Sequence, residues 1–320
     1  MTTSVPSFSD ILDTWKRISP LVKHTPVISS EALDQIFDAD IFFKCENEQE
    51  AGAFKFRGAT NAVRKLTDEQ ARKGVATHSS GNHAAALALA ANQRGIPAYI
   101  VMPRNAPDTK TQRVKKYGGK ITFCEPTLEA REQQLKKVVE RTGATFIPPY
   151  DHYDVICGQG TAGLELIEEA GPFDVVMAPV GGGGLLSGTS IVTKHLLPKA
   201  LVIAGEPANA DDARRSLKAR KLIPSVNPDT IADGLKTSLG RLNFRIISAL
   251  VDDIFTAEEN SIRQAMLLLR DKAGIMAEPS SAVPLAAMME NRELFRGKKI
   301  GMIISGGNIS DQTFEDITQS

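Results

Sequence analysis

The stretch AGAFKFRGA, residues 51–59, places one lysine, Lys55, between Phe54 and Phe56 and directly before a helix-forming run. Such a lysine lies at the start of a helix in partly apolar surroundings. Burial among apolar groups disfavours the ammonium form and makes a nucleophilic amine more available. A surface lysine whose stem lies along apolar residues would have the same local sequence. The rest of the chain decides between these two interpretations.

The composition is that of an ordinary globular protein, and it excludes several classes of function. Of the residues, 42% are hydrophobic and 24% are charged. The length of 320 residues is enough for one large or two moderate domains. The formal net charge is zero and no basic patch stands out, so nucleic acid is not an expected partner. No stretch approaches about 18 apolar residues, and the start MTTSVPSFSD has no apolar run of the signal-peptide type. We therefore expect a cytoplasmic protein without membrane attachment.

The cysteines and histidines give no sign of a disulfide framework or a catalytic zinc. Cys45, Cys124 and Cys157 are widely spaced and form no C-x-x-C motif, which predicts buried thiols in a reducing cytosol. The five histidines show no H-E-x-x-H or paired-ligand spacing, so zinc is not expected.

Strand-like and helix-like segments alternate along most of the chain. Short apolar runs predict strands at residues 40–46, 74–77, 98–102, 120–124, 174–178, 200–206 and 298–304. Apolar spacing predicts helices at residues 7–21, 31–37, 82–93, 109–117, 128–142, 155–170, 185–197, 208–219, 257–272 and 280–290. This alternation favours an α/β fold with parallel sheets covered by helices on both faces. Residues 74–150 are expected to form a small inserted domain, and residues 1–73 and 151–320 a larger one.

The first of three polar, glycine-containing turns is THSSGNH, residues 77–83, which leads into an alanine-rich helix. Successive backbone N–H groups at the start of a helix form an anion site. The turn adds side-chain donors, and a plain helix cap would need fewer of them. A substrate carboxylate is therefore expected to bind at Ser79, Ser80, Gly81, Asn82 and His83.

The second turn is PVGGGGLLSG, residues 179–188, which follows an apolar strand. Its four glycines allow very close backbone approach, and the next helix points its N-terminus at the bound group, most simply a phosphate. No Gly-Lys-Ser/Thr follows, so the turn is not a P-loop. The glycine spacing also differs from the dinucleotide-binding fingerprint, because Leu186 or Ser187 stands at the last required glycine.

The third turn is ISGGN, residues 304–308, at the end of another apolar strand. Ser305 can place its hydroxyl against a ring nitrogen, and a hydroxyl either accepts or donates a hydrogen bond. Together, the lysine and the three turns suit one phosphorylated, aromatic, aldehyde-bearing cofactor, which is pyridoxal phosphate.

The same motifs resemble those of a known family. FKFRGA, SSGNH, GQGT (residues 158–161), GGGGLLSG, TIADG (230–234), EPS (278–280) and SGGN stand in the order found in fold-type II pyridoxal phosphate enzymes. The resemblance is to the serine racemase and serine/threonine dehydratase group and spans nearly the whole chain. It implies a tryptophan synthase β-like fold of two doubly wound parallel-sheet domains, and a homodimer.

The resemblance also implies roles for individual residues. Lys55 would form the Schiff base with the cofactor and act as the base on one face of the substrate. Ser80 would act on the opposite face. Phe54 and Asn82 would contact the cofactor ring and its phenolic oxygen. Ser305 would meet the pyridine nitrogen, and the phosphate would be held by Gly181, Gly182, Gly183 and Gly184.

A divalent-cation site is implied by EPANADD, residues 206–212. Glu206, the carbonyl of Ala210 and Asp212 would be its ligands. Two carboxylates, one carbonyl and several waters suit a hard ion such as Mg²⁺, with Ca²⁺ or Mn²⁺ as alternatives. A solvated acidic helix start would have a similar sequence.

The expected substrate is a β-hydroxy amino acid with a second carboxylate, namely 3-hydroxyaspartate. Arg131 matches the racemase arginine that meets a ligand's second carboxylate, with Thr237 and His152 as further candidates. PPYDH, residues 148–152, resembles microbial hydroxyaspartate dehydratases. Loss of water would give iminosuccinate, which hydrolyses to oxaloacetate and ammonia.

Other activities remain open at this point. The same residues would serve a serine racemase or an L-serine or L-threonine dehydratase, and a non-catalytic sensor of the cofactor or of an amino acid is a further alternative. Ala85 replaces a glutamine that helps racemases bind a nucleotide, so activation by ATP is not expected. Tyr153 and Cys157 replace a usual proline and alanine, which indicates an altered substrate pocket.

Overall fold

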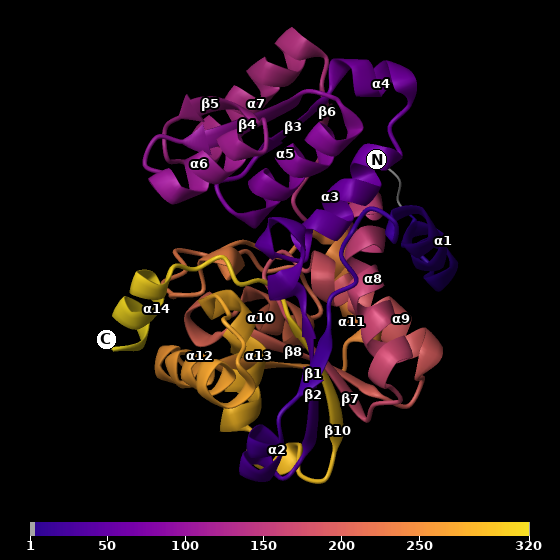
Figure 1. The fold of residues 1–320 in the computed structure, drawn as a ribbon, viewed down its shortest axis with the longest axis vertical. Coiled ribbons are helices and arrows are strands. Elements are labelled where there is room, and N and C mark those ends of the chain that lie inside the picture. Colours follow the sequence, from indigo (N-terminus) through magenta and orange to yellow (C-terminus); the bar gives the residue numbers. More distant parts are fainter. Residues whose placement is uncertain (1–3, 320) are drawn as a thin grey trace.

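The structure, a computed structural model, describes residues 4–319 and contains two sheets, one above the other in Figure 1. The first three residues of the polar N-terminal stretch lie outside this range. The six-stranded sheet has the order β1 (Val27–Ser29), β2 (Asp40–Cys45), β10 (Lys299–Ile304), β7 (Val175–Pro179), β8 (Leu201–Pro207) and β9 (Asp253–Ala257). All neighbouring pairs are parallel except β1 with β2. Segments from both ends of the chain therefore build one sheet.

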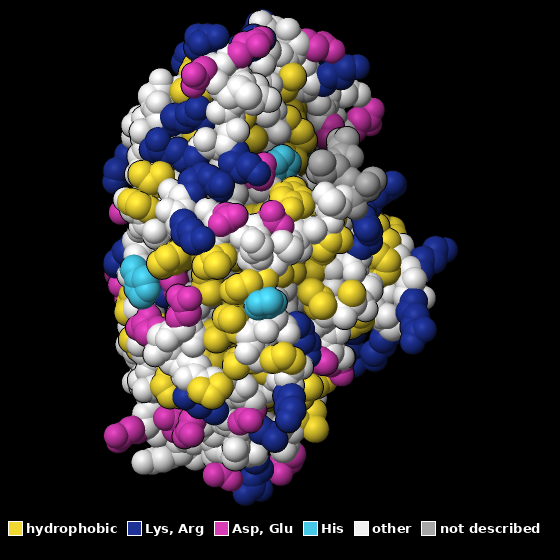
Figure 2. Space-filling view, turned by 90° about the vertical axis from the view of Figure 1, so that its right-hand side faces the viewer, with side chains coloured by type: hydrophobic (Ala, Val, Ile, Leu, Met, Phe, Trp, Pro, Cys, Tyr) yellow, Lys and Arg dark blue, Asp and Glu magenta, His cyan; other side chains and the backbone are white. Residues whose placement is uncertain are grey.

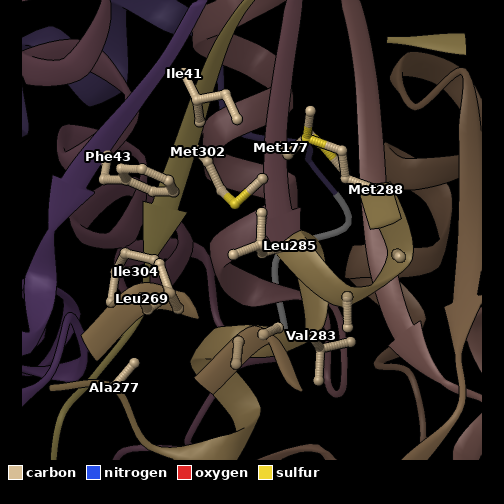
Figure 3. Close-up of a cluster of buried hydrophobic side chains, with 14 of the residues drawn as sticks. Ile41, Phe43, Met177, Leu269, Ala277, Val283, Leu285, Met288, Met302 and Ile304 are labelled. Atoms are coloured by element: carbon tan, nitrogen blue, oxygen red, sulfur yellow. The ribbon is translucent and has the colours of Figure 1, made fainter. Parts of the chain in front are cut away.

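The larger sheet is covered by helices on both faces. One face packs against α2 (Glu31–Phe37), α12 (Glu259–Ala273) and α13 (Pro279–Glu290). The other packs against α1 (Phe8–Ile18), α8 (Tyr153–Ala170), α9 (Gly184–Leu196) and α11 (Arg241–Leu250). Figure 3 shows Phe43 of β2 and Met302 and Ile304 of β10 together with Leu285 of α13. Alternate strand residues face the same side, so these side chains form a continuous apolar layer.

The smaller sheet has four parallel strands, in the order β5 (Lys120–Cys124), β4 (Ala98–Pro103), β3 (Val75–His78) and β6 (Thr145–Phe146). Helix α5 (Asn82–Arg94) covers one face and α7 (Leu128–Thr142) the other. Two further helices, α4 (Asp68–Lys73) and α6 (Asp108–Lys116), lie beside this sheet in Figure 1. The prediction of an α/β fold with parallel sheets in two domains is confirmed.

Helix α3 (Lys55–Arg64) lies between the two sheets (Figure 1). Its apolar side chains, Phe56 among them, share a core cluster with α5 and β3. Its Gly58 packs against α8, where an added Cβ would meet the Gln159 side chain at 2.5 Å. The helix therefore contacts both domains. The domain boundaries expected at residues 73 and 150 remain a prediction.

Most predicted elements begin and end within three residues of the observed ones. The predicted helix 257–272 begins two residues too early, because Ala257 is the last residue of the edge strand β9 (Asp253–Ala257) and α12 starts at Glu259. The predicted helix 208–219 is split into a short 3-10 turn (Ala208–Ala210) and α10 (Asp212–Ala219). The elements that were not predicted include β1, β6, β9, α11 and α14 (Asp311–Thr318). Strands β1 and β6 have only two or three residues, too few for a sequence pattern.

Two smaller expectations concern burial and membranes. All three cysteines are free and buried, as predicted. Among residues 4–319, no helix combines the length and apolar character needed to cross a membrane.

Candidate active site

The lysine stretch, residues 51–59, is hydrogen-bonded directly to the ISGGN turn, although about 250 residues separate them in the sequence. The Phe54 N–H donates to the Ser305 carbonyl at 3.0 Å, and Ala53 forms a β-bridge with Gly306. The Asn308 side-chain amide donates to the Ala51 carbonyl at 2.8 Å. These contacts place the start of α3 against the end of β10.

Lys55 lies at the first position of α3, as the sequence predicts, and is half-buried. Its Nζ donates a hydrogen bond to the Pro149 carbonyl at 2.8 Å and lies 4.9 Å from the centre of the Phe54 ring. Burial lowers the pKa of the Lys55 amine to about 8, and the charge of Glu278 partly opposes this shift. About a tenth of this amine is therefore a neutral nucleophile at pH 7, and about half of it at pH 8.

The glycine turn lies where β7 ends and α9 begins. Gly183 has a φ of 92°, which favours glycine, and no side chain caps α9 among residues 4–319. A Cβ on Gly182 would lie 2.3 Å from the Tyr150 ring, and one on Gly181 would lie 2.9 Å from the Leu235 backbone. The turn is thus a tight backbone cradle at a helix N-terminus, suited to an anion.

The SSGNH turn lies at the start of α5, whose N-cap residue is Gly81. Ser79 and Ser80 are half-buried, and the Gly81 N–H donates to the Ser79 hydroxyl at 3.3 Å. His83 is buried, with its Nε2 at 3.0 Å from the Ile147 carbonyl. Burial, with a further contribution from Lys55, lowers the pKa of His83 to about 3, so its ring is neutral. Since Nε2 donates to Ile147, His83 offers the turn its backbone N–H rather than a side-chain donor.

A polar network surrounds the other end of the site. The Asn82 amide donates to Glu278 Oε1 at 2.8 Å and accepts from the Asn308 amide at 2.8 Å. The hydroxyls of Ser305 and Ser281 are 2.9 Å apart, and Ser281 also bonds both backbone groups of Gly306. Ser305 is therefore held in place with hydrogen-bonding capacity to spare.

The three residues expected near the substrate side chain lie on different elements. Arg131 is on α7, and its Nε is buried without a hydrogen-bond partner among residues 4–319. Burial lowers the pKa of His78, and Arg131 lowers it further, so Arg131 lies near the strand end before Ser79. Thr237 shares a 2.9 Å hydrogen bond with the Tyr150 hydroxyl, and His152 is the N-cap residue of α8.

Tyr150 is a site residue that was not singled out from the sequence. Its ring covers Gly182, its hydroxyl bonds Thr237, and its carbonyl accepts from the Asn243 amide at 3.3 Å. The next residue, Asp151, accepts from three backbone N–H groups at the start of α11. The segment PPYDH contained the only signal, because aromatic and acidic residues follow two prolines there.

The expected cation ligands Glu206 and Asp212 are both buried. The Glu206 carboxylate accepts from the Ala213 and Arg214 N–H groups at 2.8 and 2.9 Å. Asp212 Oδ2 accepts from the Leu239 N–H at 2.9 Å, while Oδ1 is buried and has no partner among residues 4–319. Burial raises the pKa of Glu206 to about 8 and that of Asp212 to about 6. Within the same residues, no group of three or more His, Cys, Asp and Glu side chains could hold a metal.

These residues fit pyridoxal phosphate. The cradle that a Cβ at Gly181 or Gly182 would fill suits the phosphate, and the Lys55 amine suits the aldehyde. The buried Ser305 hydroxyl suits the ring nitrogen. The fold and the site therefore define an enzyme that binds a phosphorylated aldehyde cofactor through a lysine.

Comparisons with known proteins agree with this class. Residues 18–306 match the family described as pyridoxal-phosphate dependent enzyme. The chain is 49% identical to a beta-hydroxyaspartate dehydratase of Paracoccus denitrificans, over 95% of this chain and 97% of that one. It is 48% identical to a serine racemase of Arabidopsis thaliana, over 92% and 90% of the two chains. The structure of maize serine racemase superposes with a TM-score of 0.95 at 44% identity, covering 98% and 97% of the two chains.

The chain therefore belongs to the pyridoxal-phosphate dependent enzymes, and within them to the fold-type II family of serine racemases and serine/threonine dehydratases. The family and the cofactor predicted from the sequence are confirmed. The role of each site residue remains a proposal.

Proposed function

We propose that this enzyme is an ammonia-lyase that dehydrates 3-hydroxyaspartate. One observation supports this substrate above the others: Arg131 has a buried guanidinium N–H without a partner among residues 4–319, near the strand that leads into the SSGNH turn. A buried donor that is left unpaired in the free enzyme gains most from a charged acceptor, such as a second carboxylate. The beta-hydroxyaspartate dehydratase that is 49% identical supports the same substrate.

The reaction divides among the residues of the site as follows. The N–H groups at the start of α5 bind the α-carboxylate, and Arg131 binds the β-carboxylate. The Lys55 amine takes the proton from the α-carbon, while the bound cofactor supplies the aromatic system that accepts the released electron pair. The β-hydroxyl then leaves as water after it receives the proton that Lys55 removed. The resulting enamine tautomerises to iminosuccinate. Hydrolysis of iminosuccinate gives oxaloacetate and ammonia.

Racemisation or dehydration of serine is the second candidate. Ser80 is half-buried in the SSGNH turn, where its hydroxyl could return a proton to the face opposite Lys55. The serine racemase that is 48% identical supports racemisation of serine. Dehydration of L-serine or L-threonine would use the same residues. A non-catalytic sensor would keep the lysine and the phosphate cradle but would turn over none of these amino acids.

A divalent cation at Glu206, the Ala210 carbonyl and Asp212 is also part of the proposal. The unpartnered Oδ1 of Asp212 is a buried acceptor that such an ion would satisfy. The ion would be Mg²⁺, Ca²⁺ or Mn²⁺, and its ligands lie where β8 leads into α10. It would thereby support the wall of the site formed by the loop that contains Leu239.

We further propose a homodimer in the cytoplasm. Figure 2 shows hydrophobic side chains spread over the face of the molecule on which α1 and α9 lie. Apolar surface of this kind is common where two copies of a chain meet. Sedimentation at micromolar concentration should therefore give twice the mass of the chain.

An assay panel tests the substrate. Serine, threonine and the four 3-hydroxyaspartate isomers are assayed for keto-acid release and for racemisation. At least one hydroxyaspartate isomer should be the best substrate, and Arg131→Ala should reduce its kcat/KM by about 100-fold, as expected for a lost charged hydrogen bond. Arg141→Ala, an exposed arginine on the same helix, is the matched control. High serine turnover together with unchanged hydroxyaspartate turnover in Arg131→Ala would refute the assignment.

A further inference from the structure

A buried charge cluster lies behind Lys55, formed by Lys44, Glu46, Arg57 and Glu165. The side chains of Lys44, Glu46 and Arg57 are fully buried, and that of Glu165 is 2% exposed. The Arg57 guanidinium contacts both carboxylates, at 2.7 and 2.8 Å to Glu46 and at 2.7 and 2.8 Å to Glu165. The Lys44 ammonium lies 2.8 Å from Glu165. The cluster therefore joins α3 to the end of β2 and to α8.

Stability alone is a poor explanation for this cluster. Removing four charges from water is costly, and apolar residues of similar volume often stabilise a protein equally well or better. A bidentate pair, by contrast, fixes both the distance and the orientation of its partners. The cluster is thus better suited to holding α3 in one place than to adding stability.

The position of Arg57 connects this geometry to the active site. Lys55 and Arg57 are two residues apart in the first turn of α3, so their side chains point about 200° apart around the helix. Lys55 reaches the Pro149 carbonyl, whereas Arg57 reaches in the other direction to Glu46 and Glu165. No side chain caps α3 among residues 4–319. Arg57 is accordingly the charged anchor of the turn that contains the nucleophile, beside the Gly58 N–H, which donates to Gln159 Oε1 at 3.2 Å.

The same anchor leads to the phosphate cradle. Glu165 is on α8, and α8 packs backbone to backbone on α9. A Cβ added to Gly188 of α9 would lie 2.5 Å from the Gly160 nitrogen of α8. The cradle lies at the N-terminus of α9, so a series of rigid contacts connects Arg57 through α8 and α9 to the cradle. The apolar residues of α3 meanwhile pack with the smaller sheet.

We propose that Arg57 is a positioning residue. Through the buried charge cluster, it holds the Lys55 amine at a fixed distance and orientation relative to the phosphate cradle. The proposal rests on the role proposed for Lys55. According to this proposal, the cluster affects attachment of the cofactor, whereas other residues determine which substrate is bound.

Two measurements on the full-length protein test the proposal. The first is the dissociation constant of pyridoxal phosphate, followed by its visible absorbance. The second is the midpoint of the pH dependence of covalent attachment to Lys55, trapped by borohydride and located by mass spectrometry. Arg57→Lys should weaken the cofactor affinity by about ten-fold, because one ammonium cannot contact both carboxylates in bidentate fashion. The pH midpoint should rise by about one unit, because water then reaches the amine.

A second variant guards against misfolding. Arg57→Met combined with Glu46→Gln removes one charge of each sign and leaves the pair of Lys44 with Glu165 intact. It should weaken cofactor binding more than Arg57→Lys. Met288→Ala, in the apolar layer of Figure 3 and outside the cluster, is the control. It should lower the melting temperature without changing either readout.

The outcomes separate this proposal from the one on which it rests. If the Arg57 variants lose thermal stability as Met288→Ala does and keep the wild-type affinity and pH midpoint, the cluster is only structural and the proposal is wrong. If Lys55→Ala still traps the cofactor covalently, the role of Lys55 is wrong, whatever the Arg57 variants show.

Discussion

The Nζ atom of Lys55 donates a hydrogen bond to the carbonyl oxygen of Pro149 at 2.8 Å. This carbonyl is held in place because the next two residues are fixed, Tyr150 by Thr237 and Asp151 by the start of α11. A backbone carbonyl accepts a hydrogen bond from the amine and so orients it, but it is too weak a base to take its proton. The amine is thus directed by the backbone, while Glu278 acts on it only through its charge.

Replacing Lys55 by alanine should abolish both covalent cofactor attachment and turnover. The purified wild-type protein should be yellow, and the variant should lack the visible absorbance of the attached cofactor. Lys65→Ala, at the other end of α3, is the matched control and should remain yellow, because its ammonium pairs with Asp154 at a surface site. A yellow Lys55→Ala protein would contradict the assignment.

The pH dependence of cofactor attachment should follow the lowered pKa of Lys55. The amine is half neutral at about pH 8, so the attachment rate should rise up to about pH 8 and level off above it. Glu278→Gln removes a negative charge that favours the ammonium form. The curve should therefore move to lower pH, and attachment at pH 7.5 should become faster.

Stopped-flow absorbance between pH 6 and 10 measures these rates. Burial raises the pKa of Glu278 itself to about 7, so the difference between the variant and the wild type should be largest between about pH 7 and 8, where Glu278 is ionised and the wild-type amine is still partly protonated, and should vanish well above pH 8. Glu290→Gln, at the other end of α13, should leave the curve unchanged. A shift of the Glu278→Gln curve to higher pH would contradict this account.

Gly182→Ala should weaken cofactor binding through a clash with Tyr150. The added Cβ would lie 2.3 Å from the ring, so either the ring or the cradle must move. Overpacking of this kind costs about 1–3 kcal/mol, which corresponds to a loss of affinity of about 5- to 150-fold. Removing the ring in Gly182→Ala/Tyr150→Ala should recover part of the loss. An absorbance titration of the two single variants and the double variant measures the coupling, and strictly additive losses would count against the clash.

Magnesium should raise the melting temperature of the wild-type protein. A ligand that binds only the folded state at about 100 times its dissociation constant stabilises it by about 2.7 kcal/mol. Glu206→Gln should remove this increase. Asp211→Asn should preserve it, because that carboxylate pairs with Arg215 instead. An equal magnesium effect in Glu206→Gln would show that the ion binds elsewhere.

An ion pair between Lys110 and Asp233 joins α6 of the smaller domain to the loop beside the cradle. The loop's Leu235 lies against Gly181, so loosening it should affect the cradle wall. Exposed pairs contribute about 0.2–1 kcal/mol, so Asp233→Asn should raise the KM of the substrate by about 1.5- to 5-fold. The difference from the wild type should vanish at about 1 M salt, where the charges are screened. Glu69→Gln, which breaks a pair within α4, should leave the KM unchanged.

The sequence was most informative where the signal is local. The lysine at the start of α3 and the strand–turn–helix at the glycines each depend on a few neighbouring residues. The four-charge cluster and the Tyr150 ring over Gly182 depend on contacts between residues up to about 120 positions apart in the chain. Charged residues inside a core are unexpected from hydrophobic patterning, because each is favourable only with its partners present. The order of strands in the larger sheet likewise depends on contacts that no local pattern encodes.

The position of β10 between β2 and β7 has a consequence for the synthesis of the chain. The strands of the smaller sheet all come from residues 75–146, so that sheet can form while the ribosome is still translating the second half. Strand β2 must instead wait for residues 299–304 before it gains its parallel neighbour. Lys55 and Ser305 meet only at that step, so a nascent chain cannot assemble the complete cofactor site until the last strand has left the ribosome.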